Sequence, residues 1–222
     1  MLELLQAGGW AMAPIVLCSV LLLAMTAERL WALRRSAVMP AQLRPQVRDW
    51  VRGGRIDPAH LEELDRGSPL GALFATYLRA RPRGRQVLRE RVEDRGRSVM
   101  HDLERFLGAI GTIALVSPLL GLLGTVIGMV RMFLAIMTSG AGDTSALAGG
   151  IGEALICTAA GLVVAVPAYI LHRWLRGRVA DYGVEMEREL GRLDEELDPQ
   201  PVAVGGFAHA RDAGPAPIAR RG

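Results

Sequence analysis

The sequence predicts an all-α integral membrane protein with three transmembrane helices, and two observations lead to that fold class. The first is that apolar residues are clustered: residues 4–27, 106–130 and 154–171 carry no acidic or basic side chain. These runs of 24, 25 and 18 residues are long enough to cross about 30 Å of hydrocarbon at about 1.5 Å per helical residue. The second is that the arginines follow the boundaries of these runs, as they do in proteins that obey the positive-inside rule.

All 26 basic residues are arginines, with 16 in residues 32–105, eight in residues 173–222 and none in residues 1–13 or 132–152. We therefore expect the N-terminus and the loop 138–149 on the outer side of the membrane, and the long loop and the tail inside. A nucleic-acid surface is disfavoured, because ten acidic residues are mixed with the arginines of residues 32–105.

Residues 1–36 contain the first predicted span. Glu3 precedes its apolar stretch, whereas Arg29, Arg34 and Arg35 follow it. A cleaved signal peptide has the opposite arrangement, with basic residues first. We expect an anchoring helix with its N-terminus outside.

Residues 37–83 are expected to form a helical loop on the inner side. Short helices are predicted at about 46–53 and 58–66. A further helix is predicted to begin after Ser68, because serine is a favourable N-cap and Pro69 fits the first helical position.

Residues 84–137 are predicted to form one long helix that contains the second span. Apolar residues recur at three- and four-residue steps before the span, with charges on the other face, which is typical of an amphipathic helix; they are Leu88, Val92, Val99, Leu103 and Phe106. No sequence signal predicts a break before the apolar run begins.

Residues 150–197 are predicted to form a second long helix, which contains the third span. Its inner part repeats the amphipathic pattern, at Val179, Tyr182, Met186, Leu190, Leu193 and Leu197. Such an apolar stripe needs a partner, either within the subunit or in another subunit. Residues 198–222 are rich in Pro, Gly and Ala, so we expect them to be disordered.

Glycines are frequent in the second and third spans. Helices in lipid associate through close packing of small residues, since lipid is as apolar as leucine. We therefore interpret Gly121, Gly124 and Gly128 in the second span, and Gly161 in the third, as helix-packing residues.

The polar side chains of these spans are candidates for an ion pathway: Ser117, Thr125, Glu153 and Thr158. The alternative for a threonine is a bond to a carbonyl of its own helix. A carboxylate in a span usually faces a cavity, although Glu153 could instead lie at the outer interface, stabilised by the helix dipole. Arg131 could extend to the headgroups or pair with Glu153 or Asp143.

The chain offers no chemistry for a covalent step. It has no recognisable nucleophile, metal site or phosphate-binding loop, its two cysteines lie in spans, and its four histidines show no ligand spacing. We expect no cofactor, no metal and no enzymatic activity. The spans also have no carboxylate near mid-membrane, so a proton relay would need an acid supplied by a partner.

Two segments, "SPLLGLLGTVIGMVRMF" and "GGIGEALICTAAGLVVAVPAY", resemble the ExbB/TolQ/MotA family of proton-channel subunits. The opening "ELLQAGGWAMAPIVLCSVLLLAMTAERLWALRRS" is similar to ExbB-type members, and three spans match ExbB and TolQ rather than MotA. The resemblance covers residues 1–36 and 84–197.

The resemblance implies a homopentamer in the bacterial inner membrane, with a periplasmic N-terminus and a cytoplasmic C-terminus. The second and third spans would line a central pore that holds a single-span ExbD- or TolR-type partner with a membrane aspartate. By position, Thr125 and Thr158 match the family's pore threonines and Glu153 its pore glutamate. Arg131 lies where several members have a neutral polar residue, so no role carries over.

The implied function is that of a proton-channel or stator subunit. It would use the proton motive force to energise outer-membrane transport through a TonB-type protein. A TolQ-type role with a TolA-type protein in outer-membrane integrity is an alternative, as is a purely structural scaffold whose glycines only pack helices. A solute permease acting alone would need broken helices with convergent polar groups, which three spans with one acid do not offer.

Overall fold

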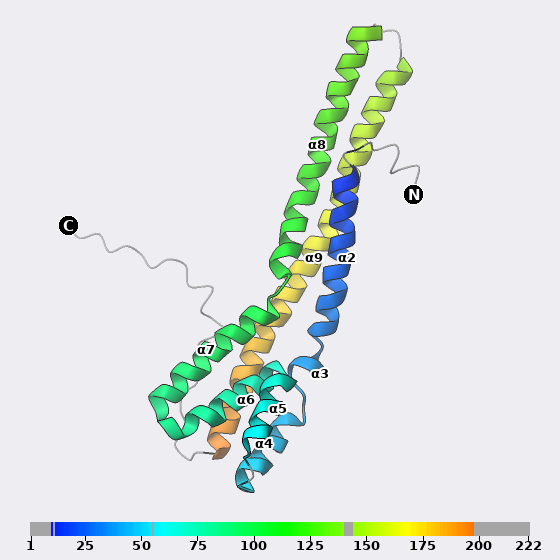
Figure 1. Ribbon diagram of the computed structural model, residues 1–222. Helices are drawn as coiled ribbons and strands as arrows, with labels where there is room; N and C mark the ends of the chain where they lie inside the picture. Colours follow the sequence, from blue (N-terminus) through cyan, green and yellow to red (C-terminus); the bar gives the residue numbers. More distant parts are fainter. Residues whose placement is uncertain (1–9, 11, 55, 140–143, 198–222) are drawn as a thin grey trace, which may run out of the picture. The chain divides into compact units, whose positions relative to one another are not determined.

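The structure is a computed structural model, and it describes residues 10, 12–54, 56–139 and 144–197, with the side chains of 138, 139 and 144–147 left out. The described chain is helical (Figure 1). The helices are α2 (Met12–Ala32), α3 (Arg35–Val38), α4 (Leu43–Arg52), α5 (Pro58–Gly67), α6 (Pro69–Ala80), α7 (Arg85–Leu103), α8 (Leu107–Ser139) and α9 (Thr144–Leu197), with a 3₁₀ turn at Arg81–Arg83.

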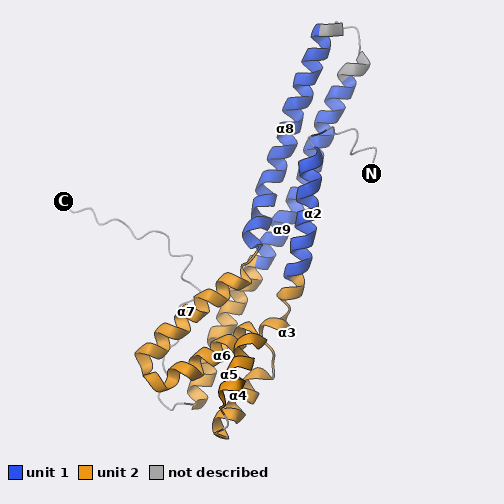
Figure 2. Cartoon of the chain, viewed as in Figure 1, with its two compact units in different colours: residues 1–29, 106–175 blue, residues 30–105, 176–222 orange. Residues whose placement is uncertain are grey.

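The chain divides into two compact units (Figure 2). Unit 1 comprises residues 1–29 and 106–175, and unit 2 comprises residues 30–105 and 176–222. Each unit is therefore built from segments far apart in the sequence. The predicted disordered tail, 198–222, lies outside the described residues.

Unit 1 contains the apolar helices. Three helices of the described chain, α2, α8 and α9, are long and apolar enough to cross a membrane, as the charge-free runs predicted. Their large apolar side chains are often exposed, for example Leu115, Phe133, Leu155 and Val163. Such a surface is expected where the surroundings are lipid or a neighbouring subunit rather than water.

The interior of unit 1 includes a small apolar cluster between α2 and α9. Met12 and Ile15 of α2 are buried against Cys157 of α9. Both cysteines are free thiols, and Cys157 behaves here as a small apolar residue. The first span therefore packs on the third.

The predicted unbroken helix over 84–137 needs a correction, because α7 ends at Leu103 and α8 begins at Leu107. The chain turns between them, and Phe106 has a left-handed backbone conformation with φ 63°. This conformation is uncommon for a residue with a side chain. The guanidinium of Arg29 lies 5.4 Å from the centre of the Phe106 ring, within the range of a cation–π contact.

The loop between the second and third spans is shorter than the predicted 138–149. Helix α8 continues to Ser139 and α9 already begins at Thr144. Gly149, the last residue of the predicted loop, lies within α9. Gly150 faces α8, since a Cβ atom added there would lie 3.3 Å from that of Met132.

Unit 2 holds the short helices predicted after the first span. Ser68 is the N-cap of α6, since its hydroxyl accepts a 3.0 Å hydrogen bond from the Gly71 amide, and Pro69 occupies the first turn. Gly71 is required where α5 meets α6, because a Cβ atom there would lie 2.3 Å from the Leu64 carbonyl oxygen.

The apolar stripe of α9 is covered within the chain. Val179, Tyr182, Met186, Leu190 and Leu193 are all buried in unit 2. The buried Tyr77 hydroxyl of α6 donates a 2.5 Å hydrogen bond to the Asp194 carboxylate of α9. The partner that the stripe requires is thus found inside the subunit.

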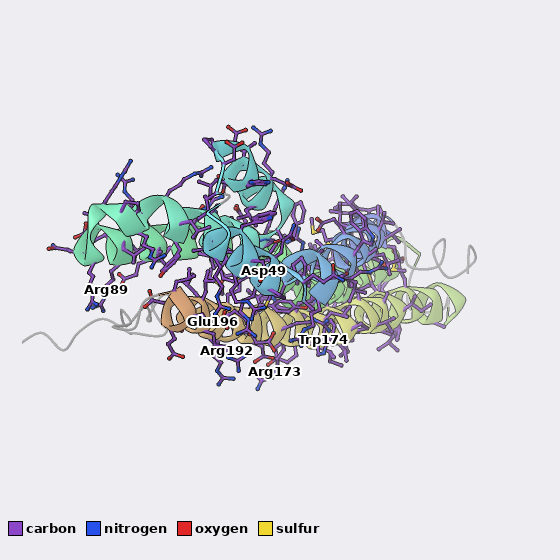
Figure 3. The ribbon with its side chains drawn as sticks, turned by 90° about the horizontal axis from the view of Figure 1, so that it is seen from below. Asp49, Arg89, Arg173, Trp174, Arg192 and Glu196 are labelled. Carbon is purple, nitrogen blue, oxygen red and sulfur yellow. The ribbon has the colours of Figure 1, made fainter. Side chains whose placement is uncertain are left out.

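Charged side chains extend from the helices of unit 2 (Figure 3). Arg89 of α7 and Arg192 of α9 are exposed examples. Arg89 pairs with Glu93 at 2.9 Å, and Arg192 with Glu189 at 2.8 Å.

Candidate functional site

The candidate site lies on the hairpin of α8 and α9, whose backbones meet at glycines. A Cβ atom at Gly161 would lie 2.5 Å from the Ser117 carbonyl oxygen, and one at Gly121 would lie 3.0 Å from the Cα atom of Thr158. Further along, a Cβ atom at Gly128 would lie 3.0 Å from that of Ala154. These approaches set an antiparallel register in which low numbers on α8 face high numbers on α9.

All four glycines that the sequence predicted to pack helices are buried, and three of them contact the opposite helix. Gly121, Gly128 and Gly161 lie directly against the opposite helix. Gly124 is also buried. Gly121, Gly128 and Gly161 therefore permit the close packing that helices in lipid use.

Thr158 joins the two helices. Its hydroxyl donates a 3.1 Å hydrogen bond to the Gly121 carbonyl across the hairpin. Thr125 lies one turn further along α8, and its hydroxyl donates to the Leu122 carbonyl of its own helix at 2.6 Å. The two hydroxyls lie near one stretch of α8, because their acceptors are the carbonyls of the neighbouring residues Gly121 and Leu122. Both threonine side chains are partly exposed.

Ser117 lies inside the subunit. Its side chain is fully buried, and its hydroxyl has no hydrogen-bond partner among the described residues. The contact with Gly161 brings α9 directly over the Ser117 backbone. That Ser117 lines an ion pathway stays a prediction.

Glu153 lies further along α9 and forms an ion pair with Arg131 of α8, with 2.7 Å between a guanidinium nitrogen and a carboxylate oxygen. Of the two partners considered for Arg131, Glu153 is thus the one observed. Asp143 lies outside the described residues.

His172 was not singled out by the sequence. Its Nδ1 lies 2.8 Å from the Leu107 carbonyl oxygen, so Nδ1 carries the proton in this bond. The ring packs on α8 at Gly111, where a Cβ atom would lie 3.0 Å from it. A glycine opposite a histidine on another helix gives no periodic signal, which is why the pair could not be predicted.

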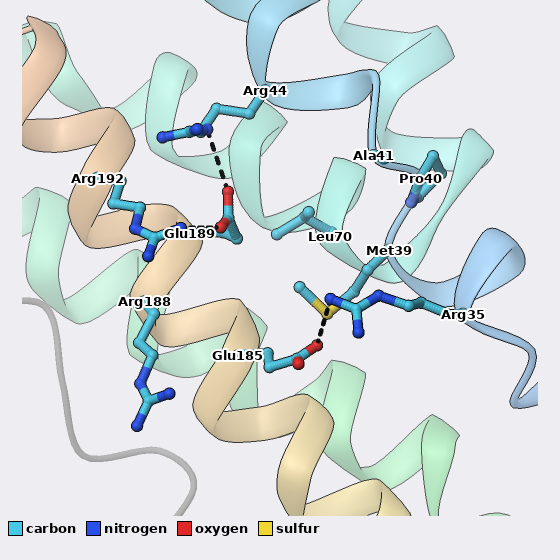
Figure 4. A pocket seen from close by; sticks show the side chains of 10 residues that line it. All are labelled: Arg35, Met39, Pro40, Ala41, Arg44, Leu70, Glu185, Arg188, Glu189 and Arg192. Atoms are coloured by element: carbon cyan, nitrogen blue, oxygen red, sulfur yellow. Dashed lines mark hydrogen bonds and ion pairs between the residues drawn. The ribbon is translucent and has the colours of Figure 1, made fainter.

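Unit 2 has a charged pocket where the segment after α2 and the start of α4 meet α9 (Figure 4). Arg35 pairs with Glu185 at 3.3 Å, and Arg44 pairs with Glu189 at 3.2 Å. These ion pairs connect α9 to the segment that contains Arg35 and Arg44.

Metal ligation has no support in the described part of the chain. It contains no group of three or more His, Cys, Asp or Glu side chains placed to hold an ion. The described polar groups of the hairpin include hydroxyls, the Glu153 carboxylate, the Arg131 guanidinium and the His172 imidazole; hydroxyls and a carboxylate can order water and exchange protons, whereas the guanidinium only donates hydrogen bonds.

Comparison with known proteins places this hairpin within a family. The sequence model described as the MotA/TolQ/ExbB proton channel family matches residues 66–188, which is more than half of the chain. The biopolymer transport protein ExbB-like 1 of Synechocystis sp. is 31% identical over 196 residues, covering 86% of this chain and 77% of the relative. ExbB-like 3 of the same organism is 28% identical over 193 residues, covering 85% of this chain and 91% of the relative.

A third relative matches a shorter part of the chain. The biopolymer transport protein ExbB of Salmonella typhimurium is 36% identical over 92 residues. This match covers 41% of this chain and 38% of the relative.

Proposed function

The chain belongs to the MotA/TolQ/ExbB proton channel family, and we propose that it is an ExbB-type subunit of a proton-driven motor. It is a multi-pass membrane protein with three helices able to span a bilayer. In this proposal it uses the proton motive force to energise outer-membrane transport through a TonB-type protein. A TolQ-type role, acting on outer-membrane integrity through a TolA-type protein, uses the same site.

The proposed assembly is a homopentamer in the bacterial inner membrane, with α8 and α9 around a central pore. The N-terminus is periplasmic, and the arginine-rich unit 2 is cytoplasmic. The distribution of arginines supports this orientation. The exposed apolar side chains of α8 and α9, such as Leu119 and Val166, support contact with neighbouring copies and lipid.

One observation carries the proposal: the hairpin presents hydroxyls but no acid in the middle of its spans. Residues 106–130 and 154–171 contain no acidic side chain, so this chain cannot relay protons alone. A single-span ExbD- or TolR-type partner supplies a membrane aspartate. Thr125 and Thr158, both partly exposed, bind that acid or the water beside it, and there is no covalent step.

The partner is tested by co-expression of the chain with a single-span protein encoded beside it. We expect a stable complex, in which native mass spectrometry counts five copies of this chain around the acid-bearing partner. A monomer that binds no such protein would contradict the proposal.

The hydroxyl is tested by Thr158→Val, with Thr158→Ser and Thr112→Val as matched variants. Thr112 is exposed and its hydroxyl bonds only the Gly108 carbonyl of its own helix, at 2.9 Å. We expect Thr158→Val to assemble but to lose uptake driven by the proton motive force, whereas the other two variants keep it. Glu153→Ala is expected to behave like Thr158→Val. Normal uptake in both Thr158→Val and Glu153→Ala would remove these residues from the pathway.

The structural-scaffold alternative has one observation in its favour, since the Thr158 hydroxyl already has a partner inside the hairpin at Gly121. If the chain is only a scaffold, Thr158→Val is harmless, while Gly124→Leu destroys assembly. Measuring assembly and uptake for both variants separates the two functions.

A further inference from the structure

The outer part of the hairpin contains an ion pair that the family resemblance did not assign. Arg131 of α8 and Glu153 of α9 meet at 2.7 Å. They can meet because the two backbones are close on both sides of the pair: a Cβ atom at Gly128 would lie 3.0 Å from that of Ala154, and one at Gly150 would lie 3.3 Å from that of Met132. The register of the helices therefore delivers the guanidinium to the carboxylate.

Within the described helices of unit 1, the pair is separated from other charges along the sequence. Arg131 is the only charged residue of α8, and Glu153 is the only acidic or basic residue in the part of α9 that belongs to unit 1 before His172. On α2, residues 12–27 carry no charge, and Cys157, one turn beyond Glu153, is a buried free thiol. Each member is thus the charged partner that the described helices provide for the other.

Arg131 is the cation that the Glu153 carboxylate contacts. A carboxylate in an apolar setting needs a cation or hydrogen-bond donors beside it, because its charge is costly there. The Glu153 side chain is 21% exposed and that of Arg131 is 48% exposed. Glu153 is therefore mostly covered, while its cation is reachable from outside the hairpin.

We propose that Arg131 is a positioning residue, which holds the Glu153 carboxylate within its own hairpin rather than towards a neighbouring chain. The role rests on the proposed function in one respect: Glu153 is the acid assigned to the proton pathway. If Arg131 paired with another acid at its exposed side, it would release the Glu153 carboxylate. Arg131 thus sets when Glu153 becomes available.

The first experiment is infrared difference spectroscopy at neutral pH on the full-length chain, in vesicles of phosphatidylethanolamine and phosphatidylglycerol. The difference between wild type and Glu153→Gln isolates the Glu153 signal. We expect the Glu153 signal at the frequency of an ion-paired carboxylate in wild type, at nearly the same frequency in Arg131→Lys, and at a shifted frequency in Arg131→Gln. Arg173→Gln is the matched control, since Arg173 is an exposed arginine on α9 (Figure 3), and it keeps the wild-type frequency.

The second experiment measures assembly and uptake in cells. Arg131→Gln is expected to lower uptake several-fold, and Arg131→Lys to restore most of it. The exchanged pair, Arg131→Glu with Glu153→Arg, is expected to assemble at the wild-type level but to remain inactive, because the acid now starts from the wrong helix.

The outcomes are distinct. An unshifted Glu153 signal in Arg131→Gln, or normal uptake by the exchanged pair, overturns the positioning role. If the infrared signals change as expected but the wild-type chain supports no uptake driven by the proton motive force, the proposed function fails while the control of Glu153 by Arg131 stands.

Discussion

At Gly161 the backbone of α9 comes so close to α8 that a methyl group does not fit. The position of a Cβ atom there is 2.5 Å from the Ser117 carbonyl oxygen, and a backbone oxygen cannot rotate away as a side chain can. Glycine at this position serves close approach rather than an unusual backbone conformation.

We expect Gly161→Ala to destabilise the protein, because overpacking costs about 1–3 kcal/mol. The midpoint of thermal unfolding in detergent should fall by several degrees. Gly108→Ala is the control: Gly108 lies on α8, and a Cβ atom there has no atom within 4 Å. Equal midpoints for the two variants would mean that α8 and α9 move apart at Gly161 without a loss of stability.

Individual site residues could be predicted by type but not by partner. A threonine or glutamate in a span is recognisable from the sequence, and so were Thr158 and Glu153. Whether Thr158 meets Gly121, or Ser117 becomes buried, depends on the register of two helices, which neither helix specifies alone. Arg131 had two candidate partners for the same reason.

At the scale of helices, the end of α2 is attached to α9 by a tyrosine. The Tyr182 hydroxyl donates a 2.8 Å hydrogen bond to the carbonyl of Leu33, which is only 2% exposed. The carbonyls that follow the last turn of a helix need partners from outside the helix. Tyr182 supplies one of them inside unit 2.

Tyr182→Phe should therefore lower the free energy of unfolding by about 1–3 kcal/mol, the typical cost of a buried carbonyl left without its donor. Tyr169→Phe is a matched control on the same helix, since Tyr169 is 59% exposed. Denaturant or thermal unfolding of both variants checks this prediction. If they are equally stable, the Leu33 carbonyl has another partner.

The helices themselves were largely predictable, whereas two boundaries were not. Charge-free runs located the spans, and Ser68 with Pro69 located the start of α6. The break before α8 carries no Gly or Pro signal, because it depends on Phe106 in a left-handed conformation. The start of α9 at Thr144 was predicted six residues too late, since the residues before Gly150 were assigned to the loop.

At the scale of the whole molecule, the two units differ in their content of charged residues. Unit 2 contains most of the arginines, including all 16 of residues 32–105. Unit 1 contains the apolar runs. This separation supports the proposed orientation, with unit 2 in the cytoplasm.

The orientation predicts where engineered cysteines react. In a background with Cys18→Ala and Cys157→Ala, Gly149→Cys should react with a membrane-impermeant maleimide added to spheroplasts. Ser98→Cys should react only after the cells are opened. Both positions are exposed. Labelling in the reverse order would invert the proposed topology.

A hairpin whose helices touch backbone to backbone has little freedom to shear. A shift of α9 by one residue would place Ala160 or Leu162 where Gly161 now lies, against the Ser117 carbonyl oxygen. The hairpin is therefore stiff, and in the proposed assembly we expect any change of shape to occur at the contacts between chains.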